Sequence, residues 1–582
     1  MKFSFDLFNG SDAPSQDFKR WISGWWYRSE GIRFESGSLP NGDEWLMAGN
    51  LLSDVNINDI INRMRTAGIE TLFKIDGQFI LVLHSKSKGD VEIYRDRTGI
   101  LPCFYAQSAK GIILSLKIND AKELAAGKAA HSQSLFEHWP IYRVSFFPDT
   151  PFDRIKSLSG RHSLSIRNRQ LSLNEHQMAL PMEGVYKDLD PAAASLGEIL
   201  SDAVKKRITG QKGLGAWLSG GNDSSLLVAL IRKHYSGNVK TVFVTFEDYQ
   251  RNYRQYAKQV ADKFNTEHTE IQLNIKEYLN LWAETVNIIQ APLNHPGIIG
   301  QTAGLKSLSG KIETIFAGEG ADTVFGGPYW APMLALSHFG GVLPLPLRDG
   351  LLQLSKKISD KTFITKVAGK ATRALGTPLP KYLHSEDSFG VEEEIDKIFG
   401  TGTYERAINA RKNCAPGDLL KGLFSFHMLY WIPLYVAAEI LLGFEFGIQS
   451  AYPFLDYELM QGSLRLPVGL RYHYSTKKAV LKRYCLNFFD KEFVYKPKEG
   501  FGVPLSKWFS KPEFTSFLNL PLEERSLKRG WWNEKELKKI IDLHRLGGGT
   551  DKSAESIPWI TTNLELWARI CLDGDSPDLY KI

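Results

Sequence analysis

The chain has 582 residues, of which 43% are hydrophobic and 23% are charged, with a formal net charge of +6. This is the composition of an ordinary folded protein, and the length suggests roughly two to four domains. A small positive charge spread over this length suits an anionic ligand and does not indicate nucleic-acid binding. The four cysteines are far apart and form no Cys-x-x-Cys pair, which argues against a zinc site or a disulfide framework and suits a reducing cytosol.

No segment predicts targeting to or insertion in a membrane. The N-terminus carries an acid at Asp6 and lacks a long apolar stretch, so we expect no signal peptide. The most apolar segment, 428–442, is short for a membrane span and contains Pro433 and Glu439, so we interpret it as a buried core helix. The expected location is the cytoplasm, with no membrane partner.

The first 185 residues are rich in strand patterns. Alternating or continuous apolar runs separated by turn residues predict strands, and a 3.6-residue period predicts a helix over 57–67. The predicted strands cover 45–48, 79–84, 90–94, 111–116 and 162–166. Sheets covered by helices fit this half of the chain.

From about residue 190, helix and strand patterns alternate. Helices are predicted over 192–205 and 253–264, and strands before Ser219 and over 239–246, 269–273 and 312–317. Such alternation indicates a doubly wound parallel sheet, which binds ligands at the carboxyl ends of its strands. Helices are expected over most of 331–440, over 534–544 and over 562–571. We therefore predict an α/β protein with domains at 1–185 and 190–582.

The segment 214–227 has the most informative pattern in the chain. An apolar run ends in Ser219-Gly220-Gly221, then Asp223, Ser224 and Ser225 open a helical pattern. Glycines let backbone N–H groups approach phosphate oxygens, and a helix N-terminus favours an anion. The spacing differs from the Gly-x-x-x-x-Gly-Lys-Ser/Thr loop and resembles the Ser-Gly-Gly-x-Asp-Ser loop of ATP pyrophosphatases. Serines and glycines of this loop would hold pyrophosphate, and Asp223 would bind magnesium.

A second motif lies at 316–327, where a predicted strand runs into Gly318-Glu319-Gly320-Ala321-Asp322. One of its two carboxylates is suited to magnesium binding and the other to base catalysis. By itself this pattern is more typical of a surface turn with solvated acids. Its position downstream of the Ser-Gly-Gly loop favours the functional interpretation.

Two further segments carry lysines, at 475–482 and 495–508. Lys498 lies between Pro497 and Gly500 in a predicted loop, where a compact cation would stabilise charge on a reacting phosphate. The alternative is a solvated basic face.

These motifs, together with Pro453-Phe454-Leu455-Asp456, resemble the asparagine synthetase superfamily, in order from about residue 72 to the C-terminus. The segments 75–79 and 94–102 more faintly resemble its glutamine amidotransferase domain. The resemblance implies an N-terminal Ntn-hydrolase-like αββα sandwich and a C-terminal ATP-pyrophosphatase sheet with helical additions. It also implies ATP and Mg²⁺ as cofactors: ATP activates a carboxylate with release of pyrophosphate, and an amine then displaces AMP to form an amide.

The resemblance assigns a role to each candidate site residue. Asp223 and Asp322 match the magnesium-binding acids, Glu319 the carboxylate that assists the amine, and Lys498 the lysine that stabilises the adenylation transition state. The nucleotide would be held by Leu218, Ser219, Gly220, Gly221, Asp223, Ser224, Ser225, Phe246 and Gly318.

The sequence departs from the family in two places. Glutamine-dependent members expose a cysteine at position 2, where this chain has Lys2, and their glutamine-holding stretches are missing, so we expect no glutamine hydrolysis. Before Pro453, the charged residues usual in asparagine synthetases are replaced by a largely apolar stretch, 435–442. Fewer cations there argue against a small acidic substrate.

Three functions remain open. We favour an amide-forming cyclase similar to lasso-peptide macrolactam synthetases, for which a precursor peptide and a leader-processing protease would be partners. β-Lactam synthetases share the plan but resemble the chain less. The second is an ammonia-dependent asparagine synthetase, and the third a non-catalytic nucleotide-binding scaffold. As partners we consider a small-molecule or peptide substrate and a second copy of the chain in a homodimer. We expect no nucleic-acid partner.

Overall fold

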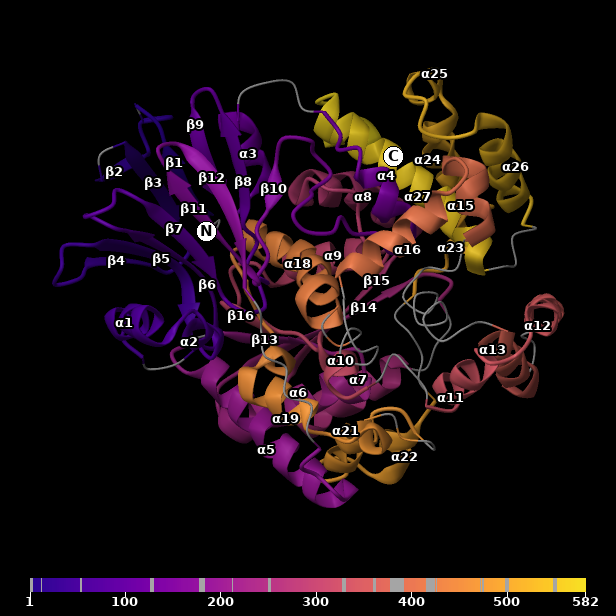
Figure 1. Ribbon diagram of the computed structural model, residues 1–582. Coiled ribbons are helices and arrows are strands. Elements are labelled where there is room, and N and C mark those ends of the chain that lie inside the picture. Colours follow the sequence, from indigo (N-terminus) through magenta and orange to yellow (C-terminus); the bar gives the residue numbers. More distant parts are fainter. Residues whose placement is uncertain are drawn as a thin grey trace.

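In the computed structural model the residues fall into an N-terminal β-sandwich and a C-terminal part built on a parallel sheet (Figure 1). The structure describes residues 4–11, 13–22, 24–52, 55–125, 130–176, 184–211, 213–249, 253–326, 331–358, 363–376, 392–414, 424, 426–471, 473, 476–497, 502–547 and 552–582.

The sandwich consists of two six-stranded sheets. The strand order is β10-β8-β9-β1-β3-β2 in one sheet and β12-β11-β7-β6-β5-β4 in the other, with neighbouring strands antiparallel. The first sheet contains β1 (Ser4–Asn9), β2 (Lys19–Ile22), β3 (Trp25–Glu30), β8 (Phe104–Ser108), β9 (Gly111–Ser115) and β10 (Lys156–Ser157). The second contains β4 (Phe34–Ser38), β5 (Glu44–Leu51), β6 (Gly77–His84), β7 (Val91–Arg95), β11 (His162–Arg167) and β12 (Gln170–Glu175).

The apolar run in β6 is continuous because both faces of its sheet are covered. Alternate residues point to opposite faces of a strand. Phe79 and Leu81 pack with α1 (Ile57–Ala67) and α2 (Glu70–Phe73), whereas Ile80 and Val82 belong to the core shared with the other sheet. Helix α3 (Ile118–Ala125) lies against β8 and β9 on the other side. The layers are therefore helix, sheet, sheet and helix, which confirms the predicted αββα sandwich.

The C-terminal part contains a five-stranded parallel sheet in the order β15-β14-β13-β16-β17. Its strands are β13 (Leu214–Trp217), β14 (Val239–Phe246), β15 (Glu267–Leu273), β16 (Thr314–Phe316) and β17 (Gln449–Ala451), and the helices between them are α6 (Asn222–His234), α7 (Tyr253–Lys263), α8 (Ile275–Ile289) and α9 (Ile298–Leu308). Helix α5 (Leu189–Ile208) precedes the sheet. The chain moves outward from β13 on one side, then returns to place β16 on its other side. This reversal of order is a topological switch point, where doubly wound sheets bind ligands.

Helices make up most of the rest of the chain. The segment predicted as a core helix begins with a π-helical turn (His427–Trp431) and continues as α18 (Ile432–Phe446), most of which is buried. None of the described helices is long and apolar enough to cross a membrane. The other helices are α4 (Leu135–Tyr142), α10 (Ala321–Val324), α11 (Ala331–Gly340), α12 (Leu345–Lys357), α13 (Phe363–Gly376), α15 (Glu392–Phe399), α16 (Thr403–Cys414), α19 (Tyr457–Leu464), α20 (Val468–Arg471), α21 (Ala479–Cys485), α22 (Lys491–Tyr495), α23 (Leu505–Trp508), α24 (Thr515–Asn519), α25 (Glu524–Leu527), α26 (Glu534–Arg545) and α27 (Lys552–Trp567).

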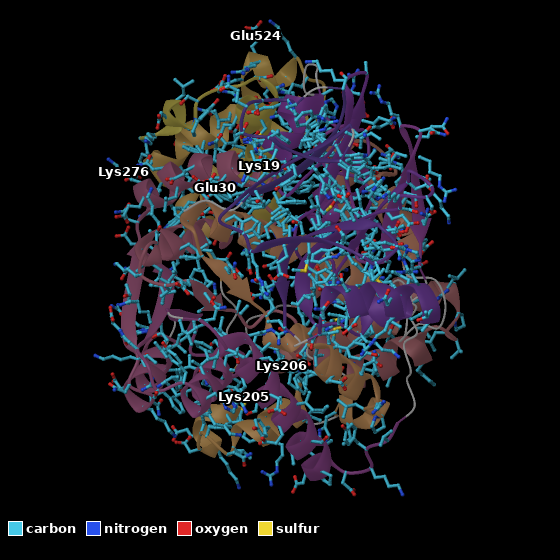
Figure 2. The ribbon with its side chains drawn as sticks, turned by 90° about the vertical axis from the view of Figure 1, so that its left-hand side faces the viewer. Lys19, Glu30, Lys205, Lys206, Lys276 and Glu524 are labelled. Carbon is cyan, nitrogen blue, oxygen red and sulfur yellow. The ribbon has the colours of Figure 1, made fainter. Side chains whose placement is uncertain are left out.

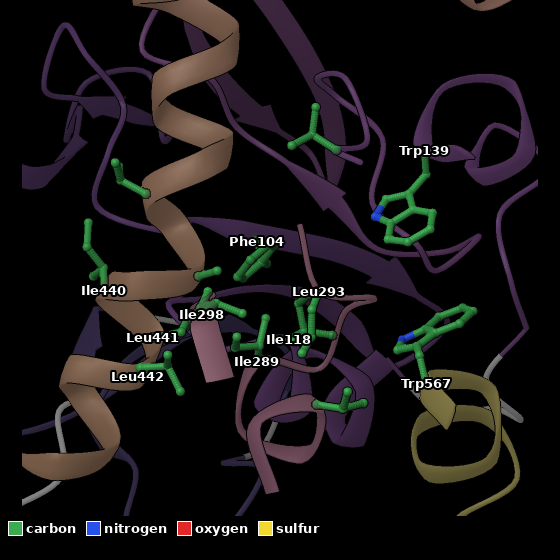
Figure 3. Close-up of a cluster of buried hydrophobic side chains, with 14 of the residues drawn as sticks. Phe104, Ile118, Trp139, Ile289, Leu293, Ile298, Ile440, Leu441, Leu442 and Trp567 are labelled. Atoms are coloured by element: carbon green, nitrogen blue, oxygen red, sulfur yellow. The ribbon is translucent and has the colours of Figure 1, made fainter. Parts of the chain in front are cut away.

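One apolar core joins the two parts. Phe104, Ile118 and Trp139 of the sandwich belong to the same buried cluster as Ile289 and Leu441 of the C-terminal part, and Figure 3 shows these side chains together. The helices around the parallel sheet thus pack directly on the sandwich. Helices α11 to α13 lie on the side of the molecule away from the sandwich (Figure 1).

Candidate active site

The Ser-Gly-Gly loop connects the end of β13 to the start of α6, as predicted. Gly220 has a φ of +74°, and a Cβ there would lie 2.6 Å from the carbonyl oxygen of Tyr253, so the turn requires glycine. Ser219 Oγ lies 2.9 Å from Ser224 Oγ, which ties the loop to the first turn of α6. The N-cap residue Gly221 provides no side-chain hydrogen bond, so the first N–H groups of the helix are left for a ligand.

The second motif lies directly beside this loop because β13 and β16 are neighbours in the sheet. A Cβ on Gly318 would lie 3.5 Å from Cβ of Asp223, which shows how closely the two loops approach. The turn continues through Gly320, whose φ is +93°, into the short helix α10 that carries Asp322. The two predicted metal ligands, Asp223 and Asp322, therefore belong to adjacent loops at the switch point.

Lys478 holds these two carboxylates together. Its Nζ lies 2.7 Å from Asp223 Oδ2 and 2.9 Å from Asp322 Oδ1. The side chain is buried, and although burial opposes its charge, the two acids raise the pKa of Lys478 above its ordinary value. This lysine is not part of a solvated basic face, so that alternative is wrong for Lys478. The sequence signal was the pair Lys477-Lys478 before an apolar helix, but nothing in it distinguished the two lysines.

Glu319 lies beside the same cluster. Burial, together with the nearby charges of Asp223 and Asp322, raises the pKa of Glu319 to about 7. A carboxylate with such a pKa is suited to exchange protons near neutral pH. Glu319 therefore lies close enough to Asp223 and Asp322 for their charges to affect its pKa.

A second buried carboxylate, which the sequence did not identify as a site residue, lies next to Glu319. Glu439 on α18 accepts hydrogen bonds from Gln301 Nε2 at 2.7 Å and from the Tyr452 hydroxyl at 3.2 Å. Burial and the charge of Glu319 raise the pKa of Glu439 well above its usual range. Nearby, the Tyr435 ring stacks on His295 at 4.9 Å, and burial lowers the pKa of His295 to about 3. This side of the site is therefore lined by aromatic rings and by an acid that favours the neutral form.

The predicted catalytic Lys498 lies outside the described residues. Its flanks are anchored near the phosphate loop: the Tyr253 hydroxyl donates to the carbonyl of Pro497 at 2.9 Å, and Gly502 N donates to the Tyr249 hydroxyl at 3.0 Å. Two residues before Lys498, burial lowers the pKa of Lys496 to about 8.

The side chains of Leu218 and Phe246 are both buried in the core. Leu218 would therefore meet a nucleotide through its backbone. The Phe246 ring packs edge-on against Tyr278 and Trp508.

The chemistry of these residues fits ATP and Mg²⁺. A helix N-terminus without a side-chain cap and a glycine turn suit a polyphosphate. The side chains of Asp223 and Asp322 keep 28% and 45% of their surface exposed, so their oxygens remain accessible. Within the described part of the chain, no group of three or more His, Cys, Asp or Glu is placed to hold a metal by itself. Two accessible aspartates suit Mg²⁺, which usually takes one or two carboxylates and completes its shell with phosphate oxygens and water.

The sandwich contains no accessible thiol among its described residues. Cys103 is the single cysteine in residues 1–185, and its side chain is fully buried. Burial raises the pKa of its thiol to about 12, so the thiolate needed for nucleophilic attack is not formed near neutral pH.

The architecture and the site define an α/β nucleotide-binding protein with an amidotransferase-like sandwich. The asparagine synthase family model matches residues 195–569, and a glutamine amidotransferase domain model matches residues 50–177. Because the first match covers well over half of the 582 residues, the chain belongs to the asparagine synthase family. It is accordingly an ATP-dependent ligase that forms C–N bonds.

Curated relatives are similar at low identity over most of their length. A putative glutamine-hydrolysing asparagine synthetase of Mycobacterium tuberculosis is 24% identical over 77% of this chain and 70% of its own. Asparagine synthetase 1 of Bacillus subtilis is 22% identical over 78% of this chain and 72% of its own. The solved NH3-dependent NAD synthetase of Campylobacter jejuni matches 24% of this chain and 61% of its own at 16% identity, with a TM-score of 0.18.

Proposed function

We propose that the chain activates a substrate carboxylate with ATP, releases pyrophosphate, and joins the carboxylate to an amine without hydrolysing glutamine. The observation that carries this proposal is the contact of Lys478 with both Asp223 and Asp322, next to Glu319. Beside a phosphate-type loop, a cation and two carboxylates provide groups that can stabilise phosphate charge and bind Mg²⁺.

The activation step uses the residues around the phosphate loop. Ser219, Gly220, Gly221 and Ser224 supply N–H and hydroxyl donors to pyrophosphate. Ser225 is fully buried, and its N–H already donates to the carbonyl of Gly221 at 3.0 Å. Asp223 and Asp322 would hold Mg²⁺, which neutralises phosphate charge when bound. Lys478 keeps these acids in place and, with Lys498, would stabilise the charge that develops at the α-phosphate.

The amide-forming step needs a base. An attacking amine must lose a proton as its nitrogen bonds to the carbonyl carbon and AMP leaves. Glu319 is the candidate base, because its raised pKa brings it close to the pH at which a proton is readily accepted. Glu439 and Tyr452 lie next to it and would orient the amine by hydrogen bonds.

The buried Cys103 supports an amine source other than glutamine. The amine would be free ammonia or a group carried by the substrate itself. The aromatic and acidic lining around Tyr435 and Glu439 favours the second, as in a cyclase of the macrolactam type acting on a peptide. Asparagine synthesis from ammonia is the second candidate, because the curated relatives are named asparagine synthetases.

The deciding experiment supplies the purified protein with ATP, magnesium, aspartate and ammonium, and separates AMP from ADP while measuring asparagine. AMP, pyrophosphate and asparagine formed together would establish ammonia-dependent asparagine synthesis and contradict the cyclase. Absence of asparagine would direct the same AMP assay to peptides that carry both a side-chain carboxylate and a free N-terminus. ADP as the product would contradict the proposed activation step itself.

A further inference from the structure

Two buried residues of the sandwich contact the loop beside the candidate site. Asp76 precedes β6 and Arg97 follows β7, and their side chains are joined by an ion pair of 2.6 Å. Arg97 Nη2 also donates to the carbonyl of Leu455 at 2.9 Å, while Tyr457 N donates to Asp76 Oδ1 at 2.9 Å. The segment 452–457, which we call the bridging loop, is thus hydrogen-bonded to the sandwich at two points.

Charged residues of helix α5 also contact the bridging loop. Asp456 of the bridging loop is fully buried and lies 3.2 Å from Arg207 Nη1 and 3.4 Å from Lys206 Nζ. Lys206, labelled on α5 in Figure 2, also lies 3.5 Å from Asp76. Asp76, Arg97, Arg207 and Asp456 are buried, and a buried charge that loses its partner is strongly destabilising, so these pairs oppose movement of the bridging loop.

The other side of the bridging loop touches the turn that carries Glu319. A Cβ on Gly320 would lie 2.5 Å from Leu455 Cδ2 and 3.4 Å from Phe454 Cβ. Just before this turn, Ala317 N donates to the carbonyl of Ala451 at 3.0 Å. The bridging loop therefore lies between the sandwich and the backbone of the Gly-Glu-Gly turn, with contacts to both.

We propose that Asp76 and Arg97 are positioning residues of the candidate active site. They hold the bridging loop, and Leu455 of that loop fixes the backbone of Gly320, with Glu319 on one side and Asp322 two residues beyond. This assigns the sandwich a task that requires no thiol chemistry: it supports the acidic turn of the ligase site. The proposal concerns the backbone of the turn and holds whichever amine is used.

The contacts provide a graded set of variants. Arg97→Met removes the hydrogen bond to the carbonyl of Leu455 and the ion pair with Asp76, while the donor and acceptor of the Tyr457–Asp76 hydrogen bond remain. Leu455→Ala keeps the charged residues of the ion network and removes the side-chain contact with Gly320, together with core packing around Leu455. Leu455→Met restores most of the side-chain volume. Two controls separate positioning from general damage. Arg28→Met breaks another pair with a buried carboxylate, Asp6, at 2.7 Å, and Asn50→Ala removes the 2.8 Å interdomain hydrogen bond to Gln449.

The measurement is hydrogen–deuterium exchange of the full chain, compared between residues 314–326 and residues 214–230. We expect Arg97→Met and Leu455→Ala to speed exchange in 314–326 by about tenfold or more with 214–230 unchanged, and Leu455→Met and both controls to leave both segments unchanged. Unchanged exchange of 314–326 in Leu455→Ala would overturn the proposal, as would equal acceleration in the Asn50→Ala control. If Arg97→Met fails to fold, the comparison of Leu455→Ala with Leu455→Met still tests the proposal. Because no turnover is measured, the result is independent of the proposed reaction.

Discussion

Both charge clusters of this protein join aspartates to cationic side chains, but the two clusters differ in accessibility. Around Asp76, Arg97 and Asp456 the charges are sealed in the interior, where main-chain groups complete their hydrogen bonds. Around Lys478 the cation is buried, but Asp223 and Asp322 keep exposed oxygens at the edge of the sheet. The first arrangement can only support structure, whereas the second can accept a ligand. Exposure of the carboxylates, rather than their presence, separates the two roles.

The largest expected effect comes from removing a carboxylate of the accessible cluster formed by Lys478, Asp223 and Asp322. In Asp223→Ala a proposed Mg²⁺ ligand is lost, and we expect pyrophosphate release to fall by about 10³-fold or more. The assay measures AMP and pyrophosphate with ATP and magnesium. Asp262→Ala, at an exposed position on α7, is the control and should be unchanged. Near-normal turnover of Asp223→Ala would contradict the metal assignment.

Replacing Lys478, the cation of the same cluster, gives the next largest expected effect. We expect Lys478→Met to lower AMP formation by about 10²–10³-fold, because the two acids then lose the charge between them. Lys477→Met is a matched control, since the neighbouring lysine side chain is exposed. Equal activities of the two variants would show that Lys478 serves only to hold the loops.

The pH dependence of amide formation tests Glu319. A base acts in its deprotonated form, so a pKa of about 7 predicts a rate that rises with pH through neutrality and then levels. We expect a rise of about tenfold between one unit below the pKa and well above it. Glu319→Gln should remove this rise, and a variant that keeps the same profile would exclude Glu319 as the base.

The smallest effect is expected in the sandwich. Cys103→Ala removes a buried thiol and should leave amide formation unchanged, with a loss of about 1 kcal/mol in the free energy of unfolding from the small cavity. Amide formation and ammonia release from glutamine would be measured on both proteins. Loss of glutamine-dependent ammonia release in the variant would contradict the inert role of this thiol.

Much of the fold could be read from periodicity. Strand β14 and helices α1 and α7 lie within a residue of their predicted bounds, because their apolar patterns are long and regular. The predicted strand at 312–317 is shorter, Thr314–Phe316, and the edge strand β17 was not predicted, since three residues show no period. The predicted division between domains at 185–190 remains a prediction.

The sequence by itself determined the two acidic glycine-rich loops of the candidate site, because their residue types and spacing are local properties of the chain. It did not determine that β13 and β16 are neighbours, which brings Asp223 and Asp322 together. Only the tertiary structure selected Lys478 over Lys477, placed Glu439 beside Glu319 and joined Asp76 to the bridging loop. These contacts link residues more than a hundred positions apart in the chain. Strand order and core packing bring such residues together, and no local pattern encodes either.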